Sequence, residues 1–341
     1  MKFSFDRKEI IIALFSVTII LLVLNIILSK VFKHSVNQIE KIELYSGEIK
    51  DRFISGIHNF GIKDDWIDED KNGIKEGDSL KISFKVKVPK DLPIVLLLNA
   101  ITNSFQPGEI TCFSQETKGN GTTNLFIASG GFEKLKAEFV YNPEIRRTSC
   151  SIGFLVYGLN TLDPIMQDQL IKAPELFTVV LVPSKESLEI SKRLKTNEKN
   201  YAVILNNDIN DLDYKLASSY SNERLKLSIR SILGDFSNAV VYLYNGNTGF
   251  TAESKFAFIN KEFEKRNVRF IDINKFILID EKAPPLDVSF ELIVKEVNEN
   301  KTDLIFISAN NYIKIKPLIS KYRKIGYKFI NPSTVLANYL K

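Results

Sequence analysis

Residues 239–272 read AVVYLYNGNTGFTAESKFAFINKEFEKRNVRFID, and this stretch decides the fold class of the larger part of the chain. An apolar run, Val240–Leu243, stops at a turn rich in Asn and Gly, after which apolar residues recur at helical spacing. A second apolar run, Val268–Ile271, ends at Asp272. The pattern predicts a βαβ unit, in which a helix connects two parallel strands. Because α/β proteins bind ligands at the ends of such strands, we expect the function of the chain there.

The composition is that of a folded protein with room for two domains and an anchor. The chain has 341 residues, of which 44% are hydrophobic and 26% are charged. Its net charge of +5 is spread over many Lys and Glu residues, without a basic block. Binding to nucleic acid is therefore not expected. The chain has only two cysteines and two histidines, which limits the chemistry available to it.

A long apolar stretch near the N-terminus predicts a membrane anchor. Ile10–Ser29 contains no charged residue, and a helix of this length spans roughly 30 Å, the thickness of a bilayer core. A cleaved signal peptide would have a shorter apolar region, and a buried core helix would have a polar face. We therefore predict a cytoplasmic N-terminus over residues 1–9 and a single transmembrane anchor over residues 10–33. A slight excess of basic residues before the span places the bulk of the chain outside the cytoplasmic membrane, in the periplasm or on the cell surface.

Residues 34–78 are expected to form a juxtamembrane helix and an acidic loop. Apolar residues between Ser35 and Phe60 recur at helical spacing, but only over about two heptads, which favours a helix packed on its own domain over a coiled coil. The acidic segment 64–77 lacks the spacing of a calcium-binding loop, and we interpret it as a solvated loop.

Residues 79–148 predict a small α+β domain. Strands are expected at Leu80–Val88, Glu109–Glu116, Thr123–Ser129 and Leu135–Tyr141, and a helix at Leu92–Phe105. Cys112 and Cys150 fall on or beside strands. In an oxidising compartment these two residues can form a disulfide, and the alternative is two isolated buried thiols.

From residue 149 onward, strands and helices alternate. The predicted strands are Cys150–Tyr157, Phe177–Val182, Tyr201–Leu205, Val240–Tyr244, Val268–Ile273, Leu304–Ser308 and Lys328–Ile330. The predicted helices are Lys185–Leu194, Asn222–Leu233, Glu253–Lys265, Val288–Val297, Tyr312–Ile325 and Ser333–Leu340. Seven strands with intervening helices fit either a (β/α) barrel or a doubly wound sheet.

Four segments carry a resemblance to a known family: Phe177–Leu194, Gly246–Asp272, Gly326–Leu340 and Val88–Pro93. Together they resemble the divergent polysaccharide deacetylase family. The sequence FTVVLVPSKESLEISKRL (Phe177–Leu194) resembles the family's second strand and the helix after it, and Gly246–Asp272 resembles its Met-Gly-Ser to Leu-Asp region. GYKFINPSTVLANYL (Gly326–Leu340) is similar to its C-terminal strand, Pro-Ser pair and helix. VPKDLP (Val88–Pro93) resembles the small domain that precedes it. The resemblance implies a distorted (β/α)7-type barrel over 149–341, preceded by the small α+β domain and the N-terminal transmembrane helix.

This chain departs from the family at the positions that bind metal in active members. Those members end their first strand with paired Asp residues, where this chain has Leu155 and Val156. They carry a His after the third strand, where this chain reads Leu205–Asn207, and another after the fourth, where it reads Tyr244–Gly246. A late Gly-His pair is replaced by Ser308–Ala309.

A deacetylase of this kind uses a divalent metal, held by imidazole and carboxylate, to activate water. No histidine lies between Asn59 and Lys341, so a His-ligated metal cannot form in this part of the chain. We therefore predict no catalytic residue, no metal ligand and no cofactor. A site made only of carboxylates from Asp163, Asp208 and Asp272 stays open, although Asp at such positions more commonly caps a helix or a turn.

Amide and aromatic side chains cluster in sequence at the predicted strand ends. We expect a ligand-binding cleft formed by Asn206, Asn207, Asp208, Tyr244, Asn245, Asn247, Asp272 and Asn310, with Asn160, Asn311, Tyr157 and Tyr312 nearby. Amides can form paired hydrogen bonds to sugar hydroxyls, and aromatic rings offer stacking faces. The alternative is that Asn only serves the turn chemistry of βα loops.

Three hypotheses on function follow. The first is a non-catalytic deacetylase-like domain that binds envelope polysaccharide or peptidoglycan. The second is an active carbohydrate esterase with an unusual carboxylate metal site. The third is a membrane-anchored scaffold that binds other proteins. The sequence makes no prediction on the oligomeric state.

Overall fold

The computed structural model describes residues 15–25, 43–70, 75–76, 79–80, 82–117, 121–147, 150–206, 209–252, 254–279, 285–297 and 302–340. These residues form two compact units. Unit 1 ends at Asn142, and unit 2 comprises Pro143–Lys341 together with the short segment His58–Ile62.

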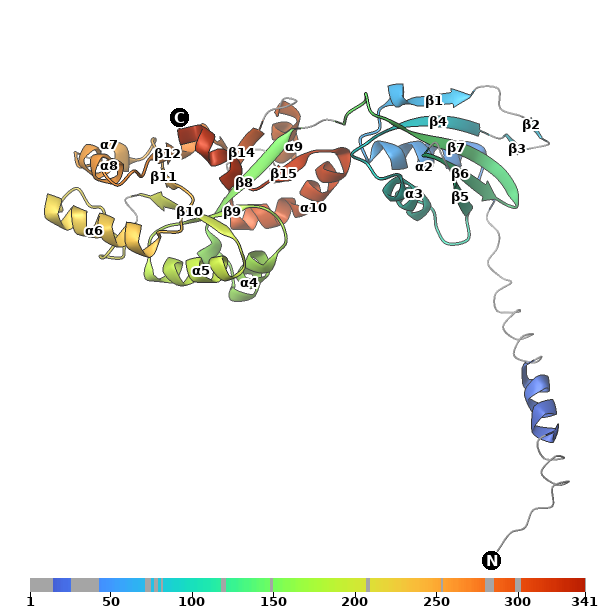
Figure 1. Cartoon of the computed structure of the whole chain (residues 1–341), viewed down its shortest axis with the longest axis horizontal. Helices are drawn as coiled ribbons and strands as arrows, with labels where there is room; N and C mark the ends of the chain where they lie inside the picture. Colours follow the sequence, from blue (N-terminus) through green and yellow to red (C-terminus); the bar gives the residue numbers. More distant parts are fainter. Residues whose placement is uncertain are drawn as a thin grey trace, which may run out of the picture. The chain divides into compact units, whose positions relative to one another are not determined.

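Near the N-terminus, residues 15–25 form a helix with exposed side chains, drawn in blue in Figure 1. The rest of the predicted anchor, 10–33, lies outside the described residues, as do residues 1–9. Among the helices that the structure describes, none is both long and apolar enough to cross a membrane.

Unit 1 is a mixed sheet covered by two helices on one face. Its strands are β1 (Ile67–Asp70), β4 (Ile82–Pro89), β5 (Thr111–Thr117), β6 (Thr122–Ser129) and β7 (Phe132–Asn142), in the order β1-β4-β7-β6-β5. Its helices are α2 (Ser46–His58) and α3 (Ile94–Asn103), and a separate pair of short strands is β2 (Lys75–Glu76) with β3 (Ser79–Leu80). The central strands β4 and β7 are parallel, and the other pairs are antiparallel.

The core of unit 1 follows from the alternation of its strands. Every second residue of β4 is buried, and Phe84 stacks on Phe53 of α2 with 5.2 Å between ring centroids. Gly56 of α2 lets Ile101 of α3 approach, since a Cβ at Gly56 would lie 3.4 Å from the Ile101 side chain. The helix expected between Ser35 and Phe60 is thus α2, and it packs on its own domain.

The acidic segment 64–77 was predicted to be a loop, but part of it forms regular secondary structure. Asp64–Trp66 form a 3-10 turn, and the next residues form strand β1, antiparallel to β4. Acidic side chains on this edge strand point to solvent, and Lys87 pairs with Asp68 at 3.1 Å. The high charge of these residues argued against a strand in the sequence. Strand formation depends instead on how the side chains fit a half-buried surface, and an edge strand tolerates charged side chains that face solvent.

Unit 2 is a curled parallel sheet with helices on its outer face (Figure 1). Its strands are β8 (Ser151–Tyr157), β9 (Thr178–Leu181), β10 (Asn200–Leu205), β11 (Tyr242–Tyr244), β12 (Phe270–Asp272), β13 (Ile277–Leu278), β14 (Thr302–Ser308) and β15 (Lys328–Ile330). Its helices are α4 (Pro164–Lys172), α5 (Lys185–Thr196), α6 (Asn222–Asp235), α7 (Gly249–Ala252), α8 (Phe256–Glu264), α9 (Leu286–Glu296), α10 (Ala309–Ile325) and α11 (Ser333–Leu336), with 3-10 turns η2 (Leu159–Thr161), η3 (Ile273–Lys275) and η4 (Ala337–Leu340). The strand order is β12-β11-β10-β9-β8-β14-β13, and β15 also pairs with β8.

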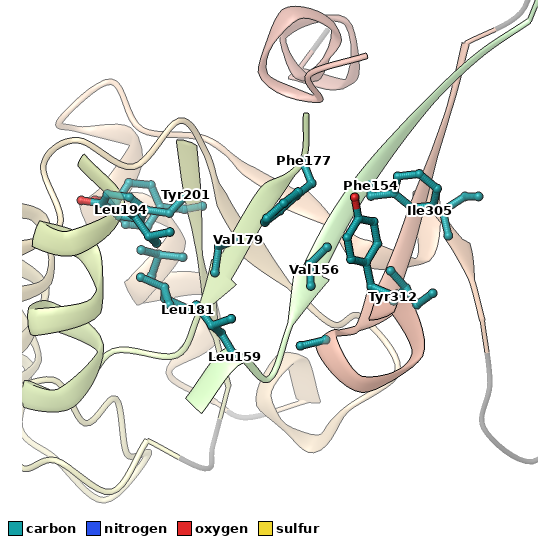
Figure 2. Packing of buried hydrophobic residues seen from close by; sticks show 14 of the residues in the cluster. Phe154, Val156, Leu159, Phe177, Val179, Leu181, Leu194, Tyr201, Ile305 and Tyr312 are labelled. Atoms are coloured by element: carbon teal, nitrogen blue, oxygen red, sulfur yellow. The ribbon is translucent and has the colours of Figure 1, made fainter. Parts of the chain in front are cut away.

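Both faces of this sheet are buried, which explains its continuous apolar runs. The outer face packs on the helices, where Phe154 lies against Tyr312 of α10 with 5.2 Å between ring centroids (Figure 2). The inner face forms a second cluster that includes Leu243 from one half of the sheet and Phe306 from the other. Because both halves of the sheet meet in one inner cluster, the sheet is a curled half-barrel.

Several elements of unit 2 differ in detail from the prediction. The predicted helix Glu253–Lys265 corresponds to α8, and the short helix α7 before it was not predicted. The predicted helix Ser333–Leu340 is α11 followed by the 3-10 turn η4. Helix α4 and strand β13 were not predicted. Cys112, half-buried in unit 1, and Cys150, buried in unit 2, are free thiols in the structure, as in the alternative of two isolated thiols.

Replacing Gly61 should destabilise unit 2. Gly61 has a φ of +76°, and a Cβ there would overlap the carbonyl oxygen of Ile325. We expect Gly61→Ala to lower the free energy of unfolding by about 2 kcal/mol or more, because strain and overlap add. Chemical denaturation followed by circular dichroism measures this. The matched control is Gly234→Ala in α6, where nothing lies within 4 Å and a stabilisation of about 0.4–1 kcal/mol is expected. Equal stability of Gly61→Ala and the wild type would contradict the prediction.

Candidate binding site at the carboxyl ends of the strands

A cavity of about 290 Å³ lies at the carboxyl ends of the parallel strands of unit 2. Its walls come from β8, β9, β10 and β14 and from the segments that directly follow β8, β9, β10, β11 and β12. The lining residues are Tyr157, Gly158, Asn160, Val180, Leu181, Val182, Ser187, Ile204, Asn206, Asn245, Ile273 and Phe306. Parallel strands bring their carboxyl ends to one edge, so residues distant in sequence meet here.

Three amide side chains line this cavity. Asn206 follows β10 directly, Asn245 follows β11 directly, and Asn160 lies in the η2 turn after β8. Gly158, with a φ of +73°, turns the chain from β8 into η2 and so brings Asn160 to the cavity. Together with the Ser187 hydroxyl, the amides offer both donors and acceptors.

The apolar part of the cavity contains a pair of stacked aromatic rings. Tyr157 at the end of β8 and Phe306 of β14 lie with their ring centroids 4.8 Å apart and their planes inclined by 15°. Val180 and Ile204 add aliphatic surface from the two strands on the other side of β8. Every residue that lines the cavity in the described chain is uncharged, so the site suits a neutral ligand with an apolar face.

Asp272 holds the loop after β11 rather than facing the cavity. Its Oδ1 accepts hydrogen bonds from the backbone amide of Gly246 at 3.0 Å, from the backbone amide of Asn274 at 3.0 Å and from the Asn274 side-chain amide at 2.8 Å. A Cβ at Gly246 would overlap the other carboxylate oxygen of Asp272, so a larger residue there would displace this side chain. The carboxylate therefore caps η3 and fixes the turn.

Asn245 and Asn247 belong to the same network. The backbone amide of Asn247 donates to Oδ1 of Asn245 at 3.0 Å, and the Asn247 side chain donates to Asn274 at 2.9 Å. Asn247 is exposed and does not line the cavity, whereas Asn245 does. The hydrogen bond from the Asn247 backbone holds the Asn245 side chain in place without a ligand. Less conformational entropy is then lost when a ligand binds.

Tyr244 lies on the outer face of the sheet, away from the inner cluster. Its ring packs against Phe256 of α8 and Phe270 of β12, with centroid distances of 5.5 Å and 6.2 Å. Burial raises the pKa of the Tyr244 phenol, and the nearby Asp272 carboxylate raises it further. Alternation along β11 sends Val241 and Leu243 inward, and Tyr244 therefore points outward.

The other residues predicted at or near the cleft either do not line the cavity or lie outside the described residues. Asn310 is exposed in the first turn of α10 and does not line the cavity, and Asn311 is buried there with its backbone amide bonded to the Ser308 hydroxyl at 3.3 Å. Tyr312 is fully buried on the outer face. Asn207 and Asp208 lie outside the described residues.

The described side chains do not fit a divalent metal centre. Asp163 accepts hydrogen bonds from the backbone amides of Ile165 and Met166 at 3.0 Å and caps α4, just as Asp272 caps η3. Leu155, which stands where active members of the resembled family carry an Asp, is buried in the inner apolar cluster. No group of three or more His, Cys, Asp or Glu side chains that could hold a metal occurs among the described residues.

Phe306 and the aliphatic side chains that line the cavity were not predicted from the sequence. Phe306 lies two residues after Leu304 and shares its inward face. The run Leu304–Ser308 was uninformative because both faces of a parallel strand are apolar. Tyr157 had been placed near the cleft, and it forms part of its wall.

No family model and no curated protein sequence matched the chain. Among solved structures, the chain is similar to PdaA of Bacillus subtilis, described as a family 4 carbohydrate esterase, with 9% identity, a TM-score of 0.36, and coverage of 56% of this chain and 82% of that one. It is also similar to BA3943 from Bacillus anthracis, described as a pseudoenzyme of that esterase family, with 14% identity, a TM-score of 0.37, and coverage of 72% and 95%. A mutant of BA3943 described as having restored enzymatic activity gives 14% identity, a TM-score of 0.35, and coverage of 72% and 98%. All three are described as members of carbohydrate esterase family 4.

Removing the Asp272 carboxylate should loosen the loop after β11. We expect Asp272→Ala to lower the free energy of unfolding by about 1–2 kcal/mol, because three N–H groups lose their acceptor. Asp272→Asn keeps the Oδ1 acceptor and should retain most of the stability. Thermal denaturation of both variants measures the difference. A wild-type unfolding temperature for Asp272→Ala would contradict the capping role.

Proposed function

We propose that the chain is a membrane-anchored, extracytoplasmic protein whose unit 2 binds carbohydrate at the carboxyl-end cavity without hydrolysing it. The observation that carries the proposal is the lining of the cavity: three amides beside a stacked Tyr157–Phe306 pair, with no charged side chain among the described lining residues.

Each part of the cavity matches one property of a sugar. Pyranose rings have an apolar face of C–H groups, which packs on aromatic and aliphatic surface such as that of Phe306 and Ile204. Hydroxyl groups at the ring edge can both donate to and accept from Asn160, Asn206 and Asn245. The volume of about 290 Å³ lies at the lower end of small-molecule sites, which favours one or two sugar units over a long chain in the cavity.

The absence of hydrolysis rests on the chemistry of the described strand ends. Hydrolysis of an acetyl group needs a base or acid within hydrogen-bond reach of the reacting water. Here Asp163 and Asp272 serve as caps, and Leu155 fills the position of an expected acid with a buried aliphatic group. Both histidines of the chain precede Asn59.

The membrane anchor and the location of the chain rest on the sequence. The uncharged stretch Ile10–Ser29 has the length of a membrane span, and more basic residues precede it than follow it. An envelope polysaccharide or peptidoglycan would then be within reach of unit 2. We therefore propose these polymers as its ligands.

Neutral envelope sugars should bind weakly at the cavity. Hydrogen bonds of about 0.5–1.5 kcal/mol each, together with the aromatic contact, give an expected dissociation constant on the order of 0.1–1 mM. Titration of neutral glycan fragments into the isotope-labelled protein, followed by NMR, should shift the amide resonances of residues 157–160, 206 and 245.

The Asn160→Ala, Asn206→Ala double variant should lose these shifts while remaining folded. The matched control is Asn310→Ala, an exposed Asn at a neighbouring strand end that does not line the cavity, and it should bind like the wild type. No shift at millimolar sugar would favour the protein-binding scaffold. Chelator-sensitive release of acetate from acetylated glycans would instead establish the active esterase.

The predicted topology is testable in cells. A reporter that fluoresces only in the cytoplasm, fused after Lys341, should stay dark, because everything after residue 33 is expected outside. The same reporter fused to the N-terminus should be bright and serves as the control. A bright C-terminal fusion would contradict the extracytoplasmic location.

A further inference from the structure

The loop after β11 contains an Asn followed by a Gly, the pair of residues at which an Asn side chain is most reactive. The backbone nitrogen of the second residue can attack the side-chain amide carbon of the Asn and close a five-membered ring. Glycine favours this attack because it has no Cβ and leaves the backbone free to turn. Asn245 and Gly246 form such a pair, and both are half-buried, so water reaches them. This pair is therefore a candidate site of chemical modification.

A carboxylate is in place to accept the proton that the attack releases. The backbone amide of Gly246 donates a hydrogen bond to Oδ1 of Asp272 at 3.0 Å. A general base must lie within hydrogen-bond reach of the proton that it removes, and Asp272 meets this requirement. A Cβ at residue 246 would overlap the second oxygen of the same carboxylate, so the glycine lets the base come this close.

Two N–H donors point at the oxygen on which negative charge develops. Attack at the side-chain carbon of Asn245 turns its carbonyl group into an oxyanion at Oδ1. This oxygen accepts a hydrogen bond from the backbone amide of Asn247 at 3.0 Å and a longer one from the side-chain amide of Asn274 at 3.4 Å. Donors that are already in position at a developing oxyanion stabilise the transition state.

The neighbouring strands hold these groups together. In the parallel pairing of β11 with β12, Tyr244 lies beside Asp272, so the two loops start side by side. Asn274 donates to Asp272 through its backbone and side chain, at 3.0 Å and 2.8 Å, and accepts from the Asn247 side chain at 2.9 Å. Groups that are fixed in this way lose less entropy on reaching the transition state. Nucleophile, base and oxyanion donors are thus assembled by the fold.

We propose that Asn245 undergoes an intramolecular deamidation that the folded loop accelerates. The backbone nitrogen of Gly246 forms a bond to the side-chain carbon of Asn245, and its proton passes to Asp272. The side-chain nitrogen then leaves as ammonia and takes that proton back from Asp272. The product is a cyclic imide, which water opens at either carbonyl to give aspartate or isoaspartate. In sum, one water is consumed and one ammonia is released, and no oxidant, reductant or cofactor is needed.

The conversion changes the chemical character of the cavity. Asn245 lines the cavity, and every lining residue in the described chain is uncharged. Either product places a carboxylate on this wall, and isoaspartate also adds a methylene group to the backbone of the loop. A neutral site in the new protein therefore becomes an acidic site as the protein ages.

Peptide mapping of the full chain measures the conversion. The protein is incubated at neutral pH in the folded state and, in parallel, unfolded in urea, and mass spectrometry quantifies aspartate and isoaspartate at residue 245. We expect conversion to be about 10-fold faster or more in the folded protein, because base and donors are assembled only there. The pairs Asn72 with Gly73 and Asn120 with Gly121 report the intrinsic rate in urea. Equal or slower conversion in the folded protein would overturn the proposal, and so would aspartate without isoaspartate.

Two matched variants test the role of the base. Asp272→Asn keeps an acceptor for the Gly246 amide but removes the base, and it should lose most of the acceleration. Asp163→Asn changes a carboxylate that caps α4 through two backbone hydrogen bonds of 3.0 Å, and it should convert residue 245 at the wild-type rate. Circular dichroism checks that both variants are folded, and the comparison of folded with unfolded wild type does not depend on either variant. Conversion at the wild-type rate in folded Asp272→Asn would overturn the proposal.

Discussion

The parallel pairing of β8 with β14 is the constraint on which unit 2 depends. The two strands align over seven residue pairs, from Ser151 beside Thr302 to Tyr157 beside Ser308. Their inner and outer faces are both buried, so a shift of register would expose one set of apolar side chains. The rest of the sheet extends from β8 through β9, β10, β11 and β12, and all of these pairs are parallel. The common direction of the strands then places Tyr157, Asn206 and Asn245 at one edge.

The sequence predicted this architecture better than its details, for physical reasons. Apolar runs with helices between them specify parallel strands, and every long run became a strand. Helix α4 was missed although Asp163 followed by Pro164 is a strong helix start, because the helix is short and only three of its residues are buried. Strand β13 has two residues, too few for any periodic signal.

Some residues of the candidate site could be predicted from the sequence, and others could not. An Asn directly after a strand can be placed at the carboxyl edge from sequence alone, which is how Asn206 and Asn245 were found. Whether a residue inside the strand points inward depends on which face the helices cover, and two apolar faces do not reveal this. Tyr244 was expected in the cleft for that reason, yet it packs against Phe256 on the helix side. The cap made by Asp272 depends on Gly246 and Asn274, whose proximity only the fold establishes.

The chemistry of the inner face follows from the same apolar packing. Leu155, Val180, Ala202, Leu243 and Leu304 fill the interior below the cavity. An ionised carboxylate among them would cost several kcal/mol unless a metal or a cation compensated it. Among the described residues, the two carboxylates of the candidate metal set, Asp163 and Asp272, instead accept backbone hydrogen bonds at the margins of the sheet. An interior of this kind gains stability from apolar burial, and the polar and stacking groups of the cavity are the amides and aromatic rings at its edge.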